Sequence, residues 1–171
     1  MELSRIDISD FDAFYLELEK IFIEDERRDY ADALRLFEEG KYEILSLIHD
    51  GKRVGFISLW NLPDFTFAEH FVIHEDCRNR GFGAAALSEI KRVYNKIVLE
   101  AEPQESDIAK RRLAFYKRNG FFENAGDYTQ PAYRKTSDGV KLVIMSYPSL
   151  LESFDKTVEA IKSTVYFDVL N

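Results

Sequence analysis

The sequence predicts an α/β fold with a mixed, mostly antiparallel sheet and helices on both of its faces. Three observations predict it. Apolar strand-like runs follow one another at residues 42–49, 52–60 and 65–73 with short turns between them, which indicates an antiparallel meander. The run 65–73 is followed by a helical pattern at 84–94 and a short strand at 97–102, and this order implies a right-handed crossover and one parallel strand pair. A last strong strand pattern covers residues 140–147.

The remaining elements take their places from helical spacing and turn residues. In chain order they are a strand at 3–8, helices at 9–22, 30–39 and 107–118, strand pieces at 121–124 and 128–133, and a turn at 137–139. Ser9 and Ser149 are expected to cap the first and last helices, and Gly40 is expected to end the second. Because no repeat or linker interrupts these patterns, we expect one domain over residues 1–171, in which the final helix and tail, 149–171, are appended to the core.

The composition limits the class of protein. A formal net charge of -8 argues against an extended nucleic-acid surface, so no nucleic-acid partner is expected. No apolar run approaches the roughly 20 residues that cross a membrane, so no membrane association is expected. The single cysteine excludes an internal disulfide and favours a cytoplasmic location. The three histidines are too scattered to predict a metal site.

The segment 78–84, Arg-Asn-Arg-Gly-Phe-Gly-Ala, joins the predicted strand 65–73 to the predicted helix 84–94. Its two glycines let the backbone turn tightly and approach a ligand. The first amides of the following helix have no intrahelical partners and attract anions, while Arg78 and Arg80 add positive charge. The segment therefore predicts a cradle for the phosphates of a ligand.

A dinucleotide is one alternative for this ligand. Gly81-x-Gly83-x-x-Ala86 formally matches the nicotinamide- or flavin-binding fingerprint, and Glu100 lies 19 residues beyond Gly81. That fingerprint, however, places its first glycine directly after a strand, whereas seven residues separate Ile73 from Gly81 here. An oxidoreductase is therefore the weaker interpretation, and a plain helix start with glycines for packing is the structural alternative.

Residues 78–83 resemble the Arg/Gln-x-x-Gly-x-Gly/Ala signature of the GNAT N-acetyltransferase superfamily. Upstream, residues 69–73, Glu-His-Phe-Val-Ile, are similar to that family's fourth strand. Downstream, residues 112–121, which contain Phe-Tyr-x-x-x-Gly-Phe, are similar to its helix segment. The resemblance covers roughly residues 1–147 and implies a fold in which two strands, 65–73 and 97–102, splay apart around acetyl-CoA.

The resemblance also implies how acetyl-CoA binds. Its pantetheine is expected to pair with exposed strand backbone, as an added strand would, and its pyrophosphate is expected to bind the amides of the glycine-rich loop. A larger residue at Gly83 should block that approach. The expected cofactor-binding residues are Val72, Ile73, Arg78, Asn79, Arg80, Gly81, Phe82, Gly83 and Ala84.

Acetyl transfer to an amine needs a group that accepts the amine proton and a group that protonates the leaving thiolate. Alternation along the strand places Glu69 on one face with phenylalanines and His70 on the other, so we expect a raised pKa for Glu69 and a role as base or water relay. A structural carboxylate paired with Arg or Lys is the alternative. The resemblance implies that Tyr116 is the acid, and a packed aromatic ring is the alternative for that residue.

Glu100 and Glu102 share one face of the predicted strand 97–102 and, with Tyr128, are expected to line the acceptor site. An acidic lining favours a cationic primary amine of a small molecule or peptide, attacked directly in a ternary complex. A solvated strand end is the alternative, and a non-catalytic, regulatory CoA-binding domain is the alternative to an enzyme. Four apolar residues of the tail are expected to be exposed and to favour a homodimer. They are Val165, Tyr166, Phe167 and Val169.

Overall fold

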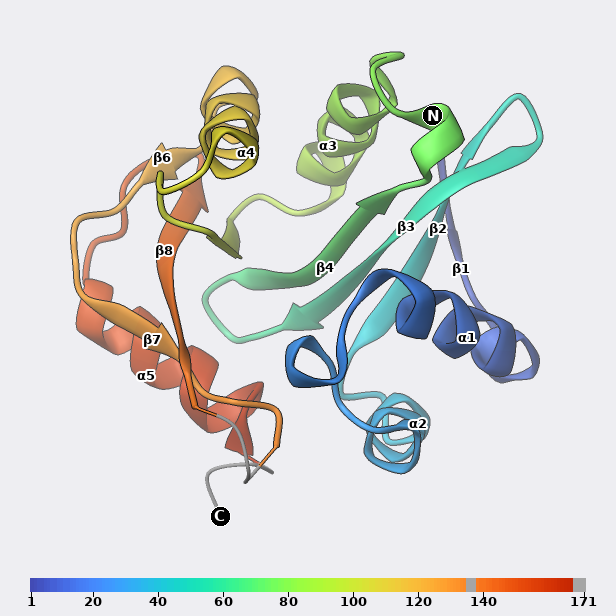
Figure 1. The fold of residues 1–171 in the computed structure, drawn as a ribbon, viewed down its shortest axis with the longest axis horizontal. Helices are drawn as coiled ribbons and strands as arrows, with labels where there is room; N and C mark the ends of the chain where they lie inside the picture. Colours follow the sequence, from blue (N-terminus) through green and yellow to red (C-terminus); the bar gives the residue numbers. More distant parts are fainter. Residues whose placement is uncertain (135–137, 168–171) are drawn as a thin grey trace.

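The computed structural model describes residues 1–134 and 138–167. Within these ranges eight strands form one mixed sheet in the order β1-β2-β3-β4-β5-β8-β6, and β7 pairs with another part of β8 (Figure 1). The predicted turn at 137–139 begins at Ser137, which lies outside the described residues. The strands are β1 (Glu2–Arg5), β2 (Glu43–His49), β3 (Lys52–Asn61), β4 (Thr66–Ile73), β5 (Ile97–Ala101), β6 (Phe122–Glu123), β7 (Tyr128–Gln130) and β8 (Val140–Tyr147).

Helices cover both faces of the sheet, as predicted. In Figure 1, α3 and α4 lie above the sheet, and α1, α2 and α5 lie below it. The helices are α1 (Phe11–Ile21), α2 (Tyr30–Glu38), α3 (Phe82–Val93), α4 (Asp107–Arg118) and α5 (Phe154–Thr164), with short 3-10 turns η1 (Ile8–Asp10), η2 (Glu24–Glu26) and η3 (Glu75–Cys77). Among the described helices, none is long and apolar enough to span a bilayer.

Two apolar cores result from the alternation of side chains along the strands. The first core packs the sheet against α1, α2 and α5, and it includes Phe56, Phe67 and Val98. The second core packs the opposite face against α3 and α4, and it includes neighbours of those residues, such as Ile57 and Leu99. Successive strand residues thus enter different cores, as a period of two requires.

The parallel pair of β4 and β5 is short. Its three paired positions are Thr66 with Ile97, Phe67 with Val98, and Ala68 with Leu99. Beyond them β4 remains paired with β3 as far as Ile73, and β5 remains paired with β8 as far as Ala101. The two strands therefore diverge after Ala68 and Leu99, which leaves one edge of each strand open and confirms the predicted fold class.

A β-bulge in β4 lies at this point of divergence. Ser58 of β3 is paired with His70, whereas the next residue of β3, Leu59, is paired with Ala68, so Glu69 is the extra residue. Such a bulge bends the strand and turns two successive side chains to the same side.

Three local expectations were wrong. Asp10, not Ser9, occupies the N-cap of α1, and the N-cap of α5 is Ser153 in place of Ser149. The tail residues Val165 and Tyr166 are fully buried in the first core, so they expose no apolar surface. Val169, which was grouped with them, lies outside the described residues.

Candidate active site

Two carboxylates occupy the point where β4 and β5 separate. Glu69 directly follows Ala68, and Glu100 directly follows Leu99, the last residues that the two strands pair. Glu69 and Glu100 both point toward the side of α1, α2 and α5, since the side chains that contact them belong to the first core. The bulge and the end of the pairing thus bring the two predicted acidic residues to one site.

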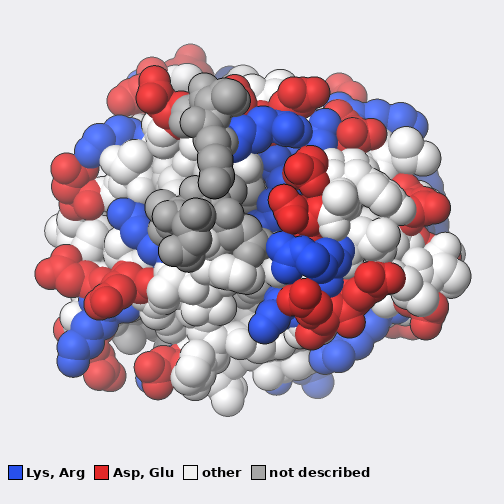
Figure 2. Space-filling view, turned by 90° about the horizontal axis from the view of Figure 1, so that it is seen from below, with Lys and Arg blue, Asp and Glu red and all other residues white. Residues whose placement is uncertain are grey.

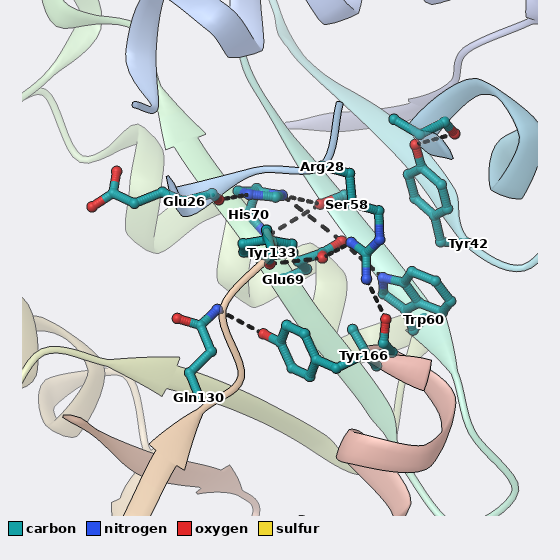
Figure 3. Close-up of polar contacts among 12 residues, drawn as sticks. Glu26, Arg28, Tyr42, Ser58, Trp60, Glu69, His70, Gln130, Tyr133 and Tyr166 are labelled. Carbon is teal, nitrogen blue, oxygen red and sulfur yellow. Dashed lines mark hydrogen bonds and ion pairs between the residues drawn. The ribbon is translucent and has the colours of Figure 1, made fainter. Parts of the chain in front are cut away.

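Glu69 is held by three donors and has only 2% of its side chain exposed (Figure 3). Trp60 Nε1 donates to Oε2 at 2.8 Å, the Tyr133 hydroxyl donates to Oε1 at 2.9 Å, and Arg28 Nη1 also donates to Oε1. Burial alone would raise the pKa of Glu69, but the Arg28 cation, the neighbouring imidazole of His70 and the hydrogen bonds from Trp60 and Arg28 outweigh burial and lower the pKa to about 2. The expected raised pKa is therefore wrong, because the carboxylate has the structural pairing that was its alternative.

His70 lies on the same side of β4 as Glu69. Its Nδ1 is 3.8 Å from Glu69 Oε2 and 3.2 Å from the Ser58 hydroxyl, and its Nε2 is 3.2 Å from the Glu26 carbonyl oxygen. The expectation that the two side chains face opposite sides is wrong because the bulge interrupts the alternation. Burial lowers the pKa of His70, which favours a neutral imidazole.

Glu100 has a different environment from Glu69. The hydroxyl of Tyr166 donates to Oε2 at 2.8 Å, and the hydroxyl of Tyr128 donates to Oε1. The Glu100 carboxyl has no cation paired with it among the described residues. Burial raises its pKa to about 7, although both tyrosine hydrogen bonds act in the opposite direction. A carboxyl with this pKa exchanges a proton near neutral pH, which is the property required of a general base.

Glu102 does not share this site. It follows the end of β5, half of its side chain is exposed, and its Oε2 lies 2.7 Å from Arg112 Nη1 of α4. The expectation that Glu100 and Glu102 line one pocket is therefore wrong. Tyr128, in contrast, is buried and donates its hydroxyl to Glu100 from within the core, and its expected place in the lining of the acceptor site stays a prediction.

Tyr116 approaches the sheet from the opposite face. It lies on α4 in the second core, where its ring packs against Phe115 and Phe121 with centroids 5.4 and 5.7 Å away. Burial raises its pKa to about 12, so the hydroxyl stays protonated at neutral pH. No hydrogen bond joins this hydroxyl to another residue in the described part of the chain. Tyr116 thus has both the proton and the free hydroxyl that an acid needs.

The predicted phosphate cradle begins after η3. Gly81 has a φ of +80° and is the N-cap of α3, and no side chain caps the helix there. The first amides of α3 therefore lack protein partners and remain available to an anion. Arg78 turns back so that its Nε donates to the Ile73 carbonyl oxygen at 3.1 Å, while the guanidinium of Arg80 lies 5.0 Å from the ring centroid of Phe82.

Gly83 is closely packed in the first turn of α3. A β-carbon built at this position would lie 3.1 Å from Phe115 Cζ of α4 and 3.7 Å from Ile73 Cγ1 of β4. The glycine therefore lets the phosphate loop, the open end of β4 and α4 approach one another. Val72 and Ile73 lie on the unpaired edge of β4 beside this loop, which is the position expected for them.

Three contributors to the site were absent from the predicted set. Arg28, Trp60 and Tyr166 all contact Glu69 or Glu100, and none was assigned to the site from the sequence. Arg28 is a cation in the acidic segment between the first two helices, and this was the one signal that the sequence offered. Tyr166 was noticed, but as an exposed residue.

Acidic and basic side chains are interspersed over the face drawn in Figure 2, and neither the acidic nor the basic side chains form an extended patch there.

The chain matches known acetyltransferases. The model of the acetyltransferase (GNAT) domain matches residues 40–123, which span β2 to β6. A protein of Bacteroides thetaiotaomicron, named as a GNAT-family acetyltransferase, has a structure that is 26% identical in sequence and superposes with a TM-score of 0.90, with coverage of 97% of this chain and 98% of that one. The structure of YncA from Salmonella typhimurium with acetyl-CoA is 16% identical and has a TM-score of 0.58 over 90% of this chain and 96% of that one.

A curated relative extends beyond this chain. YjbC of Bacillus subtilis, named as an acetyltransferase, is 26% identical over 129 residues, which are 74% of this chain and 61% of that protein. The fold, the open strand pair and these matches define the class of the protein by its GNAT fold. The chain belongs to the GNAT superfamily. The seven residues between β4 and Gly81 include η3, so the dinucleotide fingerprint lacks the strand directly before its first glycine.

Proposed function

We propose that the protein transfers an acetyl group from acetyl-CoA to a primary amine of a small molecule or peptide, by direct attack in a ternary complex. One observation carries the proposal: Glu100, a buried carboxyl whose pKa is raised to about 7, lies where the open edges of β4 and β5 diverge. A proton acceptor of this kind is useful to an amine, which is mostly protonated near neutral pH and must lose a proton to attack.

Donor binding is proposed on the other face of the sheet. The unpaired edge of β4 at Val72 and Ile73 can pair with an extended amide-containing arm, and the uncapped start of α3 can bind a pyrophosphate. Arg78, Asn79 and Arg80 are exposed beside it and can contribute charge and hydrogen bonds. The family membership and the acetyl-CoA in the YncA structure support acetyl-CoA as the donor.

The proposed reaction uses the two faces of the sheet. Glu100 accepts a proton from the amine on the side of the first core, and the amine nitrogen forms a bond to the thioester carbonyl carbon. When the carbon–sulfur bond breaks, Tyr116 on the side of the second core gives its hydroxyl proton to the leaving thiolate. After the attack the nitrogen loses its second proton, which restores the Tyr116 hydroxyl, and Glu100 releases its proton to solvent. The products are an amide and free CoA. Glu69 is not assigned the base role here, because its carboxylate is fully engaged and its pKa is about 2.

An amine panel assayed by thiol release tests this function. The wild-type protein should release CoA in the presence of an accepted amine, and the Glu100→Gln variant should turn over about 100- to 1,000-fold more slowly while it binds acetyl-CoA with unchanged Kd. Glu102→Gln is the matched control, because Glu102 is a half-exposed carboxylate outside the site. Tight binding of acetyl-CoA without turnover of any amine would favour the non-catalytic CoA-binding domain instead.

A further inference from the structure

Arg28 is the buried charge of the site that the proposed transfer leaves unused. It lies between η2 and α2, and its side chain is only 8% exposed. Nη1 donates to Glu69 and Nη2 donates to the backbone carbonyl of Val165, while the ring centroids of Trp60 and Tyr133 each lie 5.0 Å from the guanidinium carbon (Figure 3). An arginine so deeply buried requires such partners, because an unpaired charge is costly to remove from water.

These contacts connect segments that are distant in the sequence. Glu69 lies 41 residues from Arg28, and Val165 lies 137 residues from it. Val165 is followed by Tyr166, whose hydroxyl donates to Glu100 at 2.8 Å and accepts from Gln130 Nε2 at 2.7 Å. The carbonyl that Arg28 holds is therefore one residue away from a direct partner of Glu100.

We propose that Arg28 and Glu69 are a positioning pair for Glu100. The pair holds the C-terminal segment so that Tyr166 reaches Glu100, and its two opposite charges set the electrostatic field at the Glu100 carboxyl. The pair acts through Glu100 and makes no contact with the reacting atoms. This inference rests on the proposed function, in which Glu100 is the base.

The groups that face Glu100 come from four segments of the chain: β7, β4, the loop between η2 and α2, and the residues after α5. Burial is the largest influence on its pKa and raises it, the hydroxyls of Tyr128 and Tyr166 lower it, the Glu69 carboxylate raises it, and the Arg28 guanidinium lowers it. Because Glu69 and Arg28 are bonded to each other, their opposite effects on Glu100 partly cancel. Loss of Glu69 alone would leave the cation uncompensated, and loss of both would restore the balance.

The titration of Glu100 tests the electrostatic half of the proposal. Glutamate carboxyl carbons are labelled with ¹³C, and the Glu100 resonance is assigned by its absence in Glu100→Gln. In Glu69→Gln the titration midpoint should fall by about one pH unit. In the double variant Arg28→Met/Glu69→Gln, which contains no unpaired charge, the midpoint should return to within about half a unit of the wild-type value. An equal midpoint in all three proteins would overturn the proposal.

A conservative variant tests the geometric half and needs no loss of charge. Arg28→Lys keeps the cation but cannot bond Glu69 and the Val165 carbonyl in the same forked geometry. It should lower kcat about tenfold while the Kd of acetyl-CoA changes by less than about twofold. Arg27→Lys is the matched control, since Arg27 lies in the same loop but bonds the Tyr15 hydroxyl, at 2.6 Å, and Glu19. Equal kcat values for the two variants would contradict a positioning role.

The two proposals fail in different ways. If Glu100→Gln keeps full activity, the assignment of Glu100 as the base is refuted, whatever the ¹³C titration of Glu100 shows. If Glu100→Gln is inactive but Glu69→Gln leaves the Glu100 midpoint unchanged and Arg28→Lys behaves as Arg27→Lys does, only the positioning pair is refuted.

Discussion

Glu69 and Glu100 lie one residue beyond the last paired position of β4 and β5, and their carboxyl groups have opposite pKa shifts. Glu69 has a pKa of about 2 because Arg28 and its hydrogen bonds outweigh burial, whereas Glu100 has a pKa of about 7 because burial outweighs its hydrogen bonds. Two acidic side chains at equivalent positions of neighbouring strands thus differ in protonation because their surroundings differ. One is a fixed anion, and the other can exchange a proton.

The pH dependence of turnover should report Glu100. Since the carboxylate form is the proton acceptor, kcat should fall with decreasing pH through a single ionisation near pH 7, whereas the ionised state of Glu69 stays unchanged over this range. The measurement is kcat at saturating amine between about pH 5.5 and 9. The residual activity of Glu100→Gln should lack this ionisation, and an unchanged profile in that variant would assign the ionisation to another group.

Replacement of Tyr116 by Phe should separate turnover from donor binding. The phenyl ring can keep the packing against Phe115 and Phe121, but it has no proton for the thiolate. We expect kcat to fall about 10- to 100-fold, with little change in the Kd of acetyl-CoA measured by calorimetry. Full turnover in Tyr116→Phe would show that the residue is a packed aromatic without a role in proton transfer.

The order of strands and helices could be predicted from the sequence because it depends on local patterns. Each of these patterns involves residues only a few positions apart. Examples are the turn at Asp50-Gly51, the alternation in β2 and β3, and the helical spacing in α3. The placement of Glu100 on β5 followed from the same patterns. Local patterns specify what an element is and where it begins, within a few residues.

The side to which Glu69 and His70 point could not be predicted from the sequence, because one extra residue in β4 has no sequence signature of its own. A bulge changes the parity of every later residue, so Phe71 packs with the second core although Phe67 packs with the first. The pairing of Arg28 with Glu69 and with the Val165 carbonyl could not be predicted from the sequence for another reason. It depends on three segments that meet only in the folded chain.

A branched residue at Gly83 should weaken donor binding. Even a single β-carbon there would lie 3.1 Å from Phe115, so the larger side chain of valine must displace that ring or enter the space in front of the first amides of α3. Gly83→Val should raise the Kd of acetyl-CoA at least about tenfold. Ser88→Val is the matched control, because Ser88 is exposed further along α3 and reports the cost of a β-branched residue in the helix. Equal affinities in the two variants would exclude a close approach of the donor at Gly83.

Glu100 should also make the protein less stable at high pH. Its pKa is raised on folding, from about 4.3 in the unfolded chain, so the folded state holds the proton more tightly. Glu100 therefore does not lower the free energy of unfolding as long as its carboxyl is protonated in both the folded and the unfolded state. As the pH rises from about 4 to 7 the unfolded chain ionises first, and folding then carries a cost on the order of 3–4 kcal/mol.

Glu100→Gln removes that ionisation while it keeps a side chain that can hydrogen-bond to Tyr128 and Tyr166. We therefore expect the variant to have a higher free energy of unfolding than the wild type at pH 8, and to lose this advantage near pH 4. Urea unfolding at the two pH values measures both differences, and Glu102→Gln, at a half-exposed site, should show neither. A variant that is less stable than the wild type at pH 8 would mean that the Glu100 carboxylate is stabilised in the fold, and the raised pKa on which its role as base depends would be refuted. Since the same burial that makes Glu100 a proton acceptor near pH 7 also destabilises its anion, a more stable but inactive variant is the outcome that a catalytic carboxyl requires.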